Sequence, residues 1–250
     1  MIDGWEKTRF ESSAVDGEPL GHDVYTLGTG PVILIIQELP GILPQTITLA
    51  EKLVDQGFRV VMPHLFGPIG KFAFGGNMVR LFCMRREFSL FSKKKSSPIT
   101  NWLRALCAEL KEQYQVKGIG VIGMCLTGNF AISLMADDAV LAGVASQPSL
   151  PFFSQKSLHM SDDDVKQVRS ALDKKGAMLA FRFAGDKLCT KAKFNAIDNA
   201  FNIEKERIKL KTLPGNKHAI FTAHFSDEEG SPTVEALNDV FGYFKERLQG

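Results

Sequence analysis

The chain has 250 residues, of which 44% are hydrophobic and 23% charged, and its formal net charge is +2. These values are ordinary for a soluble globular protein that is long enough to bury a full core. No run approaches the roughly 18 apolar residues that span a bilayer, so no membrane-spanning helix is predicted. The first residues lack the basic and apolar segments of a secretory signal, and we expect none.

Charge is distributed unevenly along the chain. The segment 64–98 holds seven basic residues and one acid, about +6, whereas the remainder of the chain is about −4. Such asymmetry favours a local field for an anionic ligand. The alternative is a solubilising surface, which is the simpler interpretation for residues 93–95. The acidic remainder and the lack of a nucleic-acid-binding motif argue against a nucleic-acid partner.

Cysteine spacing indicates the compartment. The chain has four cysteines, Cys83, Cys107, Cys125 and Cys189. They show neither a CxxC pair nor the Cys/His spacing of a zinc site. We therefore expect free thiols in a reducing compartment, and a cytoplasmic protein.

The N-terminal part of the chain predicts a hairpin followed by a strand, a helix and a second strand. Segments at about 8–13 and 20–27, joined by turn residues, are typical of an antiparallel hairpin. The β-branched run 32–36 predicts a strand covered on both faces. Residues 43–56 show helical periodicity before a glycine, and 58–62 predict a strand stopped by the following proline.

The alternation of strands and helices continues to the C-terminal end. Further strands are predicted at 116–124, 140–146, 178–183 and 208–213. Further helices are predicted at 99–114, 126–135, 162–174, 191–201 and 233–248. This alternation indicates an α/β fold with a mostly parallel central sheet and helices on both faces. We find no repeat or linker, so we expect a single domain over 1–250 with a basic insertion at about 64–98 near the site.

The hexapeptide Gly-Met-Cys-Leu-Thr-Gly at 123–128 places Cys125 between a buried strand and a helix. A side chain at such a turn projects over the carboxyl edge of the sheet. The helix N-terminus also favours a thiolate over a thiol. Cys125 is therefore a candidate nucleophile, and the alternative is a small buried thiol that fills the core.

Two further residues complete a possible triad. Asp186 follows the strand 178–183, and His218 follows the strand 208–213. The chain order Cys125, Asp186, His218 is the nucleophile–acid–base order of α/β-hydrolases. This order favours catalysis over a structural thiol.

The other histidines are His22, His64, His159 and His224, and a structural role is the simpler interpretation for a lone histidine. His64 is the exception among them, because it follows a strand end and is a candidate to line the site and bind substrate.

The loop after the first buried strand, Gln-Glu-Leu-Pro-Gly at 37–41, is the second part of the expected site. Acyl transfer needs N–H donors for the oxyanion, and the amides of Leu126 and Leu39 are the candidates. Glu38 needs a partner, because a carboxylate beside a buried run is otherwise costly. It either accepts hydrogen bonds from the following helix or hydrogen-bonds the Cys125 thiol.

The Glu38 loop, the Cys125 turn, Asp186 after Ala-Gly and His218 together resemble the dienelactone hydrolase family (carboxymethylenebutenolidase-like) of the α/β-hydrolase superfamily. The resemblance covers about residues 8–248. It implies a Cys–His–Asp triad, hydrolysis of an enol-lactone such as dienelactone, a glutamate–thiol hydrogen bond, and no metal or other cofactor.

The chain departs from that family in two respects that affect the site. Thr127 stands where the family usually has glycine, which predicts a slightly wider turn at the nucleophile. Family members that act on dienelactone carry an arginine shortly after the catalytic histidine, and residues 219–222 offer none. Arg85 or Arg86 could bind a substrate carboxylate instead, since arginine binds carboxylates bidentately. The alternative is that one of them simply pairs with Glu87 or an adjacent helix.

These features predict a hydrolase that cleaves a small ester or enol-lactone, carrying a carboxylate, through an acyl-enzyme. The alternative is a non-catalytic small-ligand binding protein on a hydrolase scaffold. The expected partner is a small-molecule substrate, with no nucleic acid and no membrane, and the sequence does not set the oligomeric state.

Overall fold

The computed structural model describes residues 2–13, 19–71, 98–149, 158 and 160–250. Most of the predicted basic insertion, including Arg85 and Arg86, lies outside these ranges. Cys83 lies outside them as well.

One eight-stranded sheet forms the centre of the structure, in the order β1-β2-β4-β3-β5-β6-β7-β8. β1 pairs antiparallel with β2 and β2 with β4, and every other neighbouring pair is parallel. The strands are β1 (Glu6–Ser13), β2 (Pro19–Leu27), β3 (Val32–Ile36), β4 (Arg59–His64), β5 (Ile119–Met124), β6 (Val140–Ser146), β7 (Met178–Phe183) and β8 (Ile208–Leu213). This arrangement confirms the predicted α/β class and the N-terminal hairpin.

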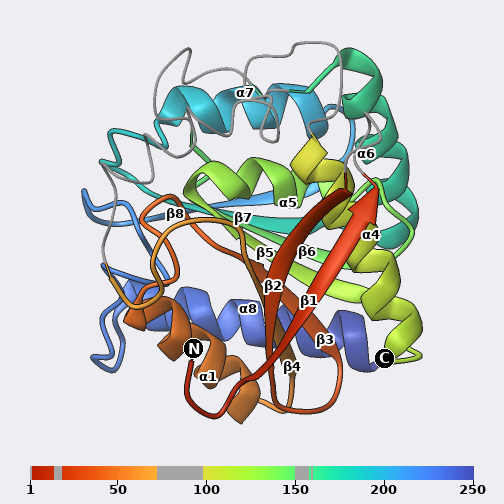
Figure 1. The fold of residues 1–250 in the computed structure, drawn as a ribbon. Helices are drawn as coiled ribbons and strands as arrows, with labels where there is room; N and C mark the ends of the chain where they lie inside the picture. Colours follow the sequence, from red (N-terminus) through yellow and green to blue (C-terminus); the bar gives the residue numbers. More distant parts are fainter. Residues whose placement is uncertain (1, 14–18, 72–97, 150–157, 159) are drawn as a thin grey trace.

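Helices cover both faces of the sheet, with α1 and α8 on one side and α4, α5, α6 and α7 on the other (Figure 1). Their bounds are α1 (Pro44–Asp55), α4 (Pro98–Gln113), α5 (Gly128–Leu134), α6 (Asp162–Lys175), α7 (Lys191–Phe201) and α8 (Pro232–Gln249). Each side has its own hydrophobic cluster, and β3 is fully buried between the two. The continuous apolar runs of the central strands follow from this double cover.

The end of β4 differs from the prediction that Pro63 stops the strand. β4 continues to His64, because β2 pairs with it as far as the register Asp23↔His64. On its other side, the pairing with β3 ends at Val61. Proline is tolerated in a strand where no neighbour needs its missing N–H.

The parallel strands bring the predicted site residues to one edge of the sheet. β3, β5, β7 and β8 all run in the same direction, so the loops at their carboxyl ends lie along one edge. Those loops carry Glu38, Cys125, Asp186 and His218. The carboxyl edge of an open α/β sheet is where such folds bind ligands.

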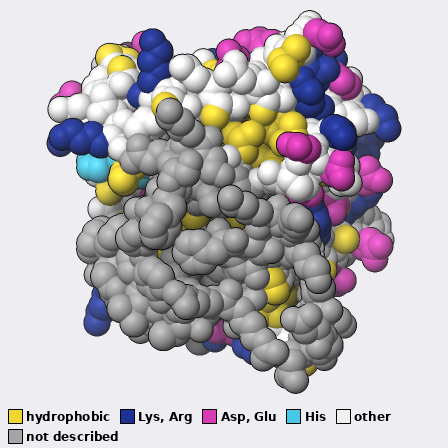
Figure 2. Space-filling view, turned by 90° about the horizontal axis from the view of Figure 1, so that it is seen from above, with side chains coloured by type: hydrophobic (Ala, Val, Ile, Leu, Met, Phe, Trp, Pro, Cys, Tyr) yellow, Lys and Arg dark blue, Asp and Glu magenta, His cyan; other side chains and the backbone are white. Residues whose placement is uncertain are grey.

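The described surface is mixed in charge. Figure 2 shows basic and acidic side chains interspersed around apolar ones over the described part of one face. Among the described helices, none combines the length and apolarity needed to cross a bilayer.

Candidate active site

Cys125 lies in a strained turn between β5 and a short 3-10 helix, Cys125–Thr127, that leads into α5. Its φ of 56° is in the left-handed region, which costs a non-glycine residue roughly 1–3 kcal/mol. The turn also needs Gly123, because a Cβ there would lie 2.2 Å from the carbonyl oxygen of Thr127. Strain of this kind is typical of a nucleophile that is projected above a sheet.

Thr127 ties the two central strands together beneath the turn. Its Oγ1 accepts a hydrogen bond from Met124 N at 3.0 Å. The same hydroxyl lies 3.0 Å from Met124 O and 3.1 Å from Ile36 O, either of which accepts its proton. A second close backbone approach falls at Gly128, where a Cβ would lie 2.9 Å from Pro148 Cα. Threonine at 127 therefore contributes a link between β3 and β5 that glycine lacks.

The structure brings Asp186 and His218 into direct contact. His218 Nδ1 lies 2.8 Å from Asp186 Oδ2. The other oxygen, Oδ1, accepts from the backbone N–H groups of Leu188 at 2.8 Å and Cys189 at 3.0 Å. Asp186 is buried, and its orientation is fixed by three hydrogen bonds from two directions. This is how an acid orients a catalytic imidazole.

The electrostatics of the pair favour a charged imidazolium. Burial lowers the pKa of His218, but the hydrogen bond to Asp186 and the nearby sulfur of Cys125 outweigh it and raise the pKa to about 10. Burial likewise raises the pKa of Asp186, but His218 and the two backbone donors bring it below its usual value. The site therefore stabilises a negative carboxylate beside a positive ring.

Cys125 is the third member of the group. Because Asp186 occupies Nδ1, Nε2 is the nitrogen of His218 that is available to the sulfur. Nε2 is buried and has no hydrogen-bond partner of good geometry among the described residues. A base in an unliganded site often forms its hydrogen bond to the nucleophile only with substrate bound.

Glu38 does not make the contacts expected from the sequence. It is 2% exposed, and its Oε1 accepts a hydrogen bond from Thr222 Oγ1 at 2.6 Å. Burial raises the pKa of the Glu38 carboxyl, although Thr222 and His218 oppose that shift. In the described part of the chain, no hydrogen bond joins Glu38 to Cys125, and the expected glutamate–thiol bond is absent there.

Nor does Glu38 cap α1, which was the other expectation. The N-cap of that helix is Leu43, whose N–H donates to Thr46 Oγ1 at 3.2 Å. Thr222 explains the difference, because it lies four residues after His218 and reaches back to Glu38 from the last loop of the site. This partner was not predicted from the sequence, since nothing in the spacing links residues so far apart.

Ser149 is the hydrogen-bonding partner that the structure gives to the nucleophile. Its Oγ lies 3.3 Å from Cys125 Sγ, and its backbone N–H donates to Cys125 O at 3.0 Å. This contact was not predicted from the sequence either. The available signal was a group of polar residues, Ser146, Gln147 and Ser149, at the carboxyl end of the buried strand β6 and so at the same edge of the sheet.

The two predicted oxyanion amides lie at the ends of adjacent strands. Leu39 follows Glu38 in a turn closed by Gly41 N donating to Glu38 O at 2.9 Å. Leu126 lies in the first turn after Cys125, where helical N–H groups lack intrahelical acceptors. β3 and β5 are direct neighbours, so both amides belong to the same part of the edge.

The hydrogen bond of the His64 side chain is made within its own loop. Its Nε2 lies 2.6 Å from Gly67 O. Within the described ranges, no hydrogen bond or ion pair connects it to Cys125, Asp186 or His218.

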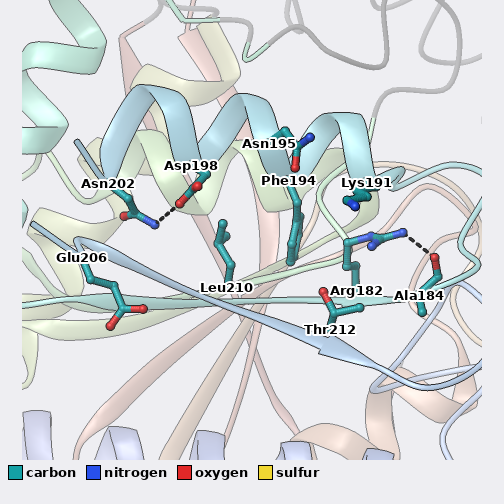
Figure 3. A pocket seen from close by; sticks show the side chains of 10 residues that line it. All are labelled: Arg182, Ala184, Lys191, Phe194, Asn195, Asp198, Asn202, Glu206, Leu210 and Thr212. Atoms are coloured by element: carbon teal, nitrogen blue, oxygen red, sulfur yellow. Dashed lines mark hydrogen bonds between the residues drawn. The ribbon is translucent and has the colours of Figure 1, made fainter. Parts of the chain in front are cut away.

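A separate pocket of about 580 Å³ lies between α7 and β8 (Figure 3). Some of its polar groups are engaged in structural bonds. Arg182 donates to Cys189 O at 2.9 Å and to Ala184 O at 2.7 Å, and Asn202 donates to Asp198 at 2.8 Å. None of the predicted site residues lines this pocket.

The described residues contain no group of three or more His, Cys, Asp or Glu side chains that could hold a metal ion.

Comparisons with known proteins identify a family and a fold. The sequence model of the dienelactone hydrolase family matches residues 23–248. No curated protein sequence matches the chain.

Solved structures of similar fold include a dienelactone hydrolase-like promiscuous phosphotriesterase from metagenomic libraries, with a TM-score of 0.65 and 15% identity over 97% of this chain and 99% of that one. The dienelactone hydrolase of Anabaena variabilis ATCC 29413 has a TM-score of 0.61 and 14% identity over 98% and 99%. A cold-adapted esterase from an Arctic intertidal metagenomic library has a TM-score of 0.60 and 12% identity over 99% of this chain and 96% of that one. At such identities the likeness shows a shared fold.

Proposed function

The chain belongs to the dienelactone hydrolase family, and we propose that it is a carboxylic-ester hydrolase with Cys125 as its nucleophile. The observation that carries the proposal is the 2.8 Å hydrogen bond between His218 and a buried Asp186, beside a cysteine in a left-handed turn. A purely structural thiol requires neither the backbone strain nor an oriented imidazole next to it.

In the proposed reaction, the Cys125 sulfur attacks the carbonyl carbon of the ester. The electron pair of the carbonyl moves to its oxygen, and the amides of Leu39 and Leu126 stabilise the resulting oxyanion. When the intermediate collapses, the C–O bond to the leaving group breaks and His218 donates its proton to that oxygen. Asp186 keeps the imidazole in the tautomer that this transfer needs.

Water then completes the cycle. His218, now neutral, takes a proton from a water molecule, whose oxygen attacks the thioester carbon. The C–S bond breaks, the carboxylic acid product leaves, and the thiolate–imidazolium pair returns. The raised pKa of His218 suits this cycle, because it favours transfer of the thiol proton to the ring before substrate arrives.

As substrate we propose a small ester or enol-lactone that bears a carboxylate. Arg85 and Arg86 are the proposed carboxylate partners, on the evidence of the sequence. Arg85→Ala or Arg86→Ala should raise KM for acidic substrates and leave KM for matched neutral esters unchanged. An equal effect on both substrate types would argue for a structural role. A panel of lactones and esters, paired by the presence of a carboxylate, is the assay.

The proposal is tested first at the nucleophile. A mechanism-based acylating probe should add its acyl mass to the peptide that contains Cys125, and Cys125→Ala should lower ester hydrolysis at least about 1,000-fold. A folded Cys125→Ala protein that still hydrolyses aryl esters or dienelactone would contradict the proposal. No adduct on Cys125 in the wild-type protein would instead favour the alternative, a ligand-binding protein on a hydrolase scaffold.

We further propose that the protein acts in the cytoplasm as a single domain. The three cysteines that the structure describes, Cys107, Cys125 and Cys189, are free and buried, which suits a reducing compartment.

A further inference from the structure

A buried polar network continues from the nucleophile into helix α7. Lys193 on α7 is 1% exposed, and its Nζ donates to Asn129 Oδ1 at 2.7 Å. Asn129, on α5, donates through Nδ2 to Leu126 O at 3.1 Å and to Ser149 O at 3.1 Å. Ser149 in turn contacts Cys125 through both its backbone and its hydroxyl.

The chemistry of Lys193 fixes the direction of this network. An ammonium group only donates, so the oxygen of the Asn129 amide must face it. The amide nitrogen is thereby directed at the two carbonyls, which belong to Leu126 and Ser149. The loop after β6 is thus bonded to the turn that carries the nucleophile, and the position of the Ser149 hydroxyl is determined by groups buried behind it.

Once the Cys125 thiol has lost its proton, the direction of its hydrogen bond with the Ser149 hydroxyl is determined. A thiolate has no proton to give, so Ser149 must donate and the sulfur must accept. At 3.3 Å the two atoms are within the range of such a bond. Hydrogen bonds to an ionised group stabilise the charged form and lower the pKa of its acid.

We propose that Ser149 is a further residue of the catalytic site, whose hydroxyl donates a hydrogen bond to the Cys125 thiolate and stabilises it between turnovers. This inference rests on the proposed function, because it concerns the same sulfur. It assigns to Ser149 the contact that the sequence led us to expect from Glu38, whose carboxyl is engaged by Thr222 instead.

Two other titratable groups lie near the sulfur. His218 faces it from the loop after β8, and Cys189, in the loop after β7, is close enough for the charge of Cys125 to raise the pKa of the Cys189 thiol. Both stay unchanged in a Ser149 variant, so a difference between that variant and the wild-type protein reports the hydroxyl alone.

The test is the pH profile of Cys125 alkylation by iodoacetamide, followed by mass spectrometry of the Cys125 peptide. The midpoint of the acid limb reports the ionisation of the thiol and is insensitive to how easily the reagent enters. Ser149→Ala should move this midpoint upward by about one pH unit, which corresponds to loss of one hydrogen bond to a charged group.

Ser146→Ala is the matched control. It removes a buried hydroxyl from the end of β6, just before the loop that carries Ser149, and that hydroxyl bonds to the Gln147 side chain. Its midpoint should stay at the wild-type value. Ser149→Gly is a second variant that also removes the hydroxyl, and thermal unfolding shows whether each protein is folded.

The outcomes separate this inference from the proposed function. If wild-type Cys125 reacts no faster than the buried Cys107, the nucleophile itself is wrongly assigned. If Cys125 is reactive but Ser149→Ala and Ser149→Gly keep the wild-type midpoint, the role of Ser149 alone is refuted. An upward shift in both, without a shift in Ser146→Ala, supports it.

Discussion

Replacing Asp186 by asparagine tests how the structure orients the catalytic imidazole. Asp186 Oδ1 accepts two backbone N–H groups, from Leu188 and Cys189, while Oδ2 faces His218 Nδ1. In Asp186→Asn the amide has one oxygen and one NH2 group to distribute between these two sides. The choice it makes decides which nitrogen of His218 carries the proton.

The magnitude follows from those contacts. If the amide oxygen faced His218, the NH2 group would oppose the two backbone donors, and each unsatisfied donor costs roughly 1–3 kcal/mol. The oxygen therefore stays with Leu188 and Cys189, and the NH2 group donates to Nδ1. The ring proton is then forced onto Nε2, which faces Cys125, so His218 can no longer accept the thiol proton. Loss of general-base function of this kind lowers kcat by about 100- to 10,000-fold.

The assay is kcat/KM for an aryl ester, together with thermal unfolding to show that Asp186→Asn is folded. Asp227→Asn is the control, because that carboxylate is 72% exposed and its ion pair with Lys52 lies on the surface. It should keep wild-type kinetics. A folded Asp186→Asn protein that retains more than about a tenth of wild-type kcat/KM would refute the assigned tautomer.

Three further predictions concern stability. Glu38→Gln should be more stable than wild type. Burial raises the pKa of the Glu38 carboxyl, so the native state keeps a proton that the unfolded state releases above pH 4.5. The free energy of unfolding of the wild-type protein therefore falls as pH rises from that value. Melting temperatures from pH 4 to 8 should diverge for Glu38→Gln and stay parallel for the exposed Glu112→Gln. Thr127→Val should lose about 1–3 kcal/mol of unfolding free energy, measured with urea, because it leaves buried backbone groups of two strands unpaired, whereas Thr127→Ser should not. Gly123→Ala should lower the melting temperature, since its Cβ has no room, while Gly242→Ala, with open space on α8, should raise it slightly; equal effects at the two glycines would contradict the packing described for the turn.

The order of elements was predictable from the sequence because the hydrophobic periodicity is strong. The β-branched run of β3 and the buried apolar face of α4 can each be recognised from residues that are close together in the sequence. The end of β4 was not predictable, since Pro63 is tolerated only because of which neighbours pair there. That information lies in the arrangement of the sheet and in no local pattern.

The site divides in the same way. Asp186 and His218 could be found because each directly follows a predicted strand, and the topology places strand ends side by side. The partners of Glu38 and Cys125 could not be found, because Thr222 and Ser149 lie within loops whose path depends on tertiary packing. Sequence reasoning identified the groups that carry charge, and it missed the hydroxyls that hold them.

The bond between Glu38 and Thr222 joins residues that are 184 positions apart in the chain. Thr222 and His218 both follow β8, which is the last strand in the chain and lies at one edge of the sheet. During synthesis Cys125 is therefore made, and its turn can form, well before His218 and Thr222 leave the ribosome. The thiol stays without its imidazole until β8 docks on β7. The rate at which Cys125 reacts with a thiol reagent would therefore report the completion of folding and could be followed over time during refolding.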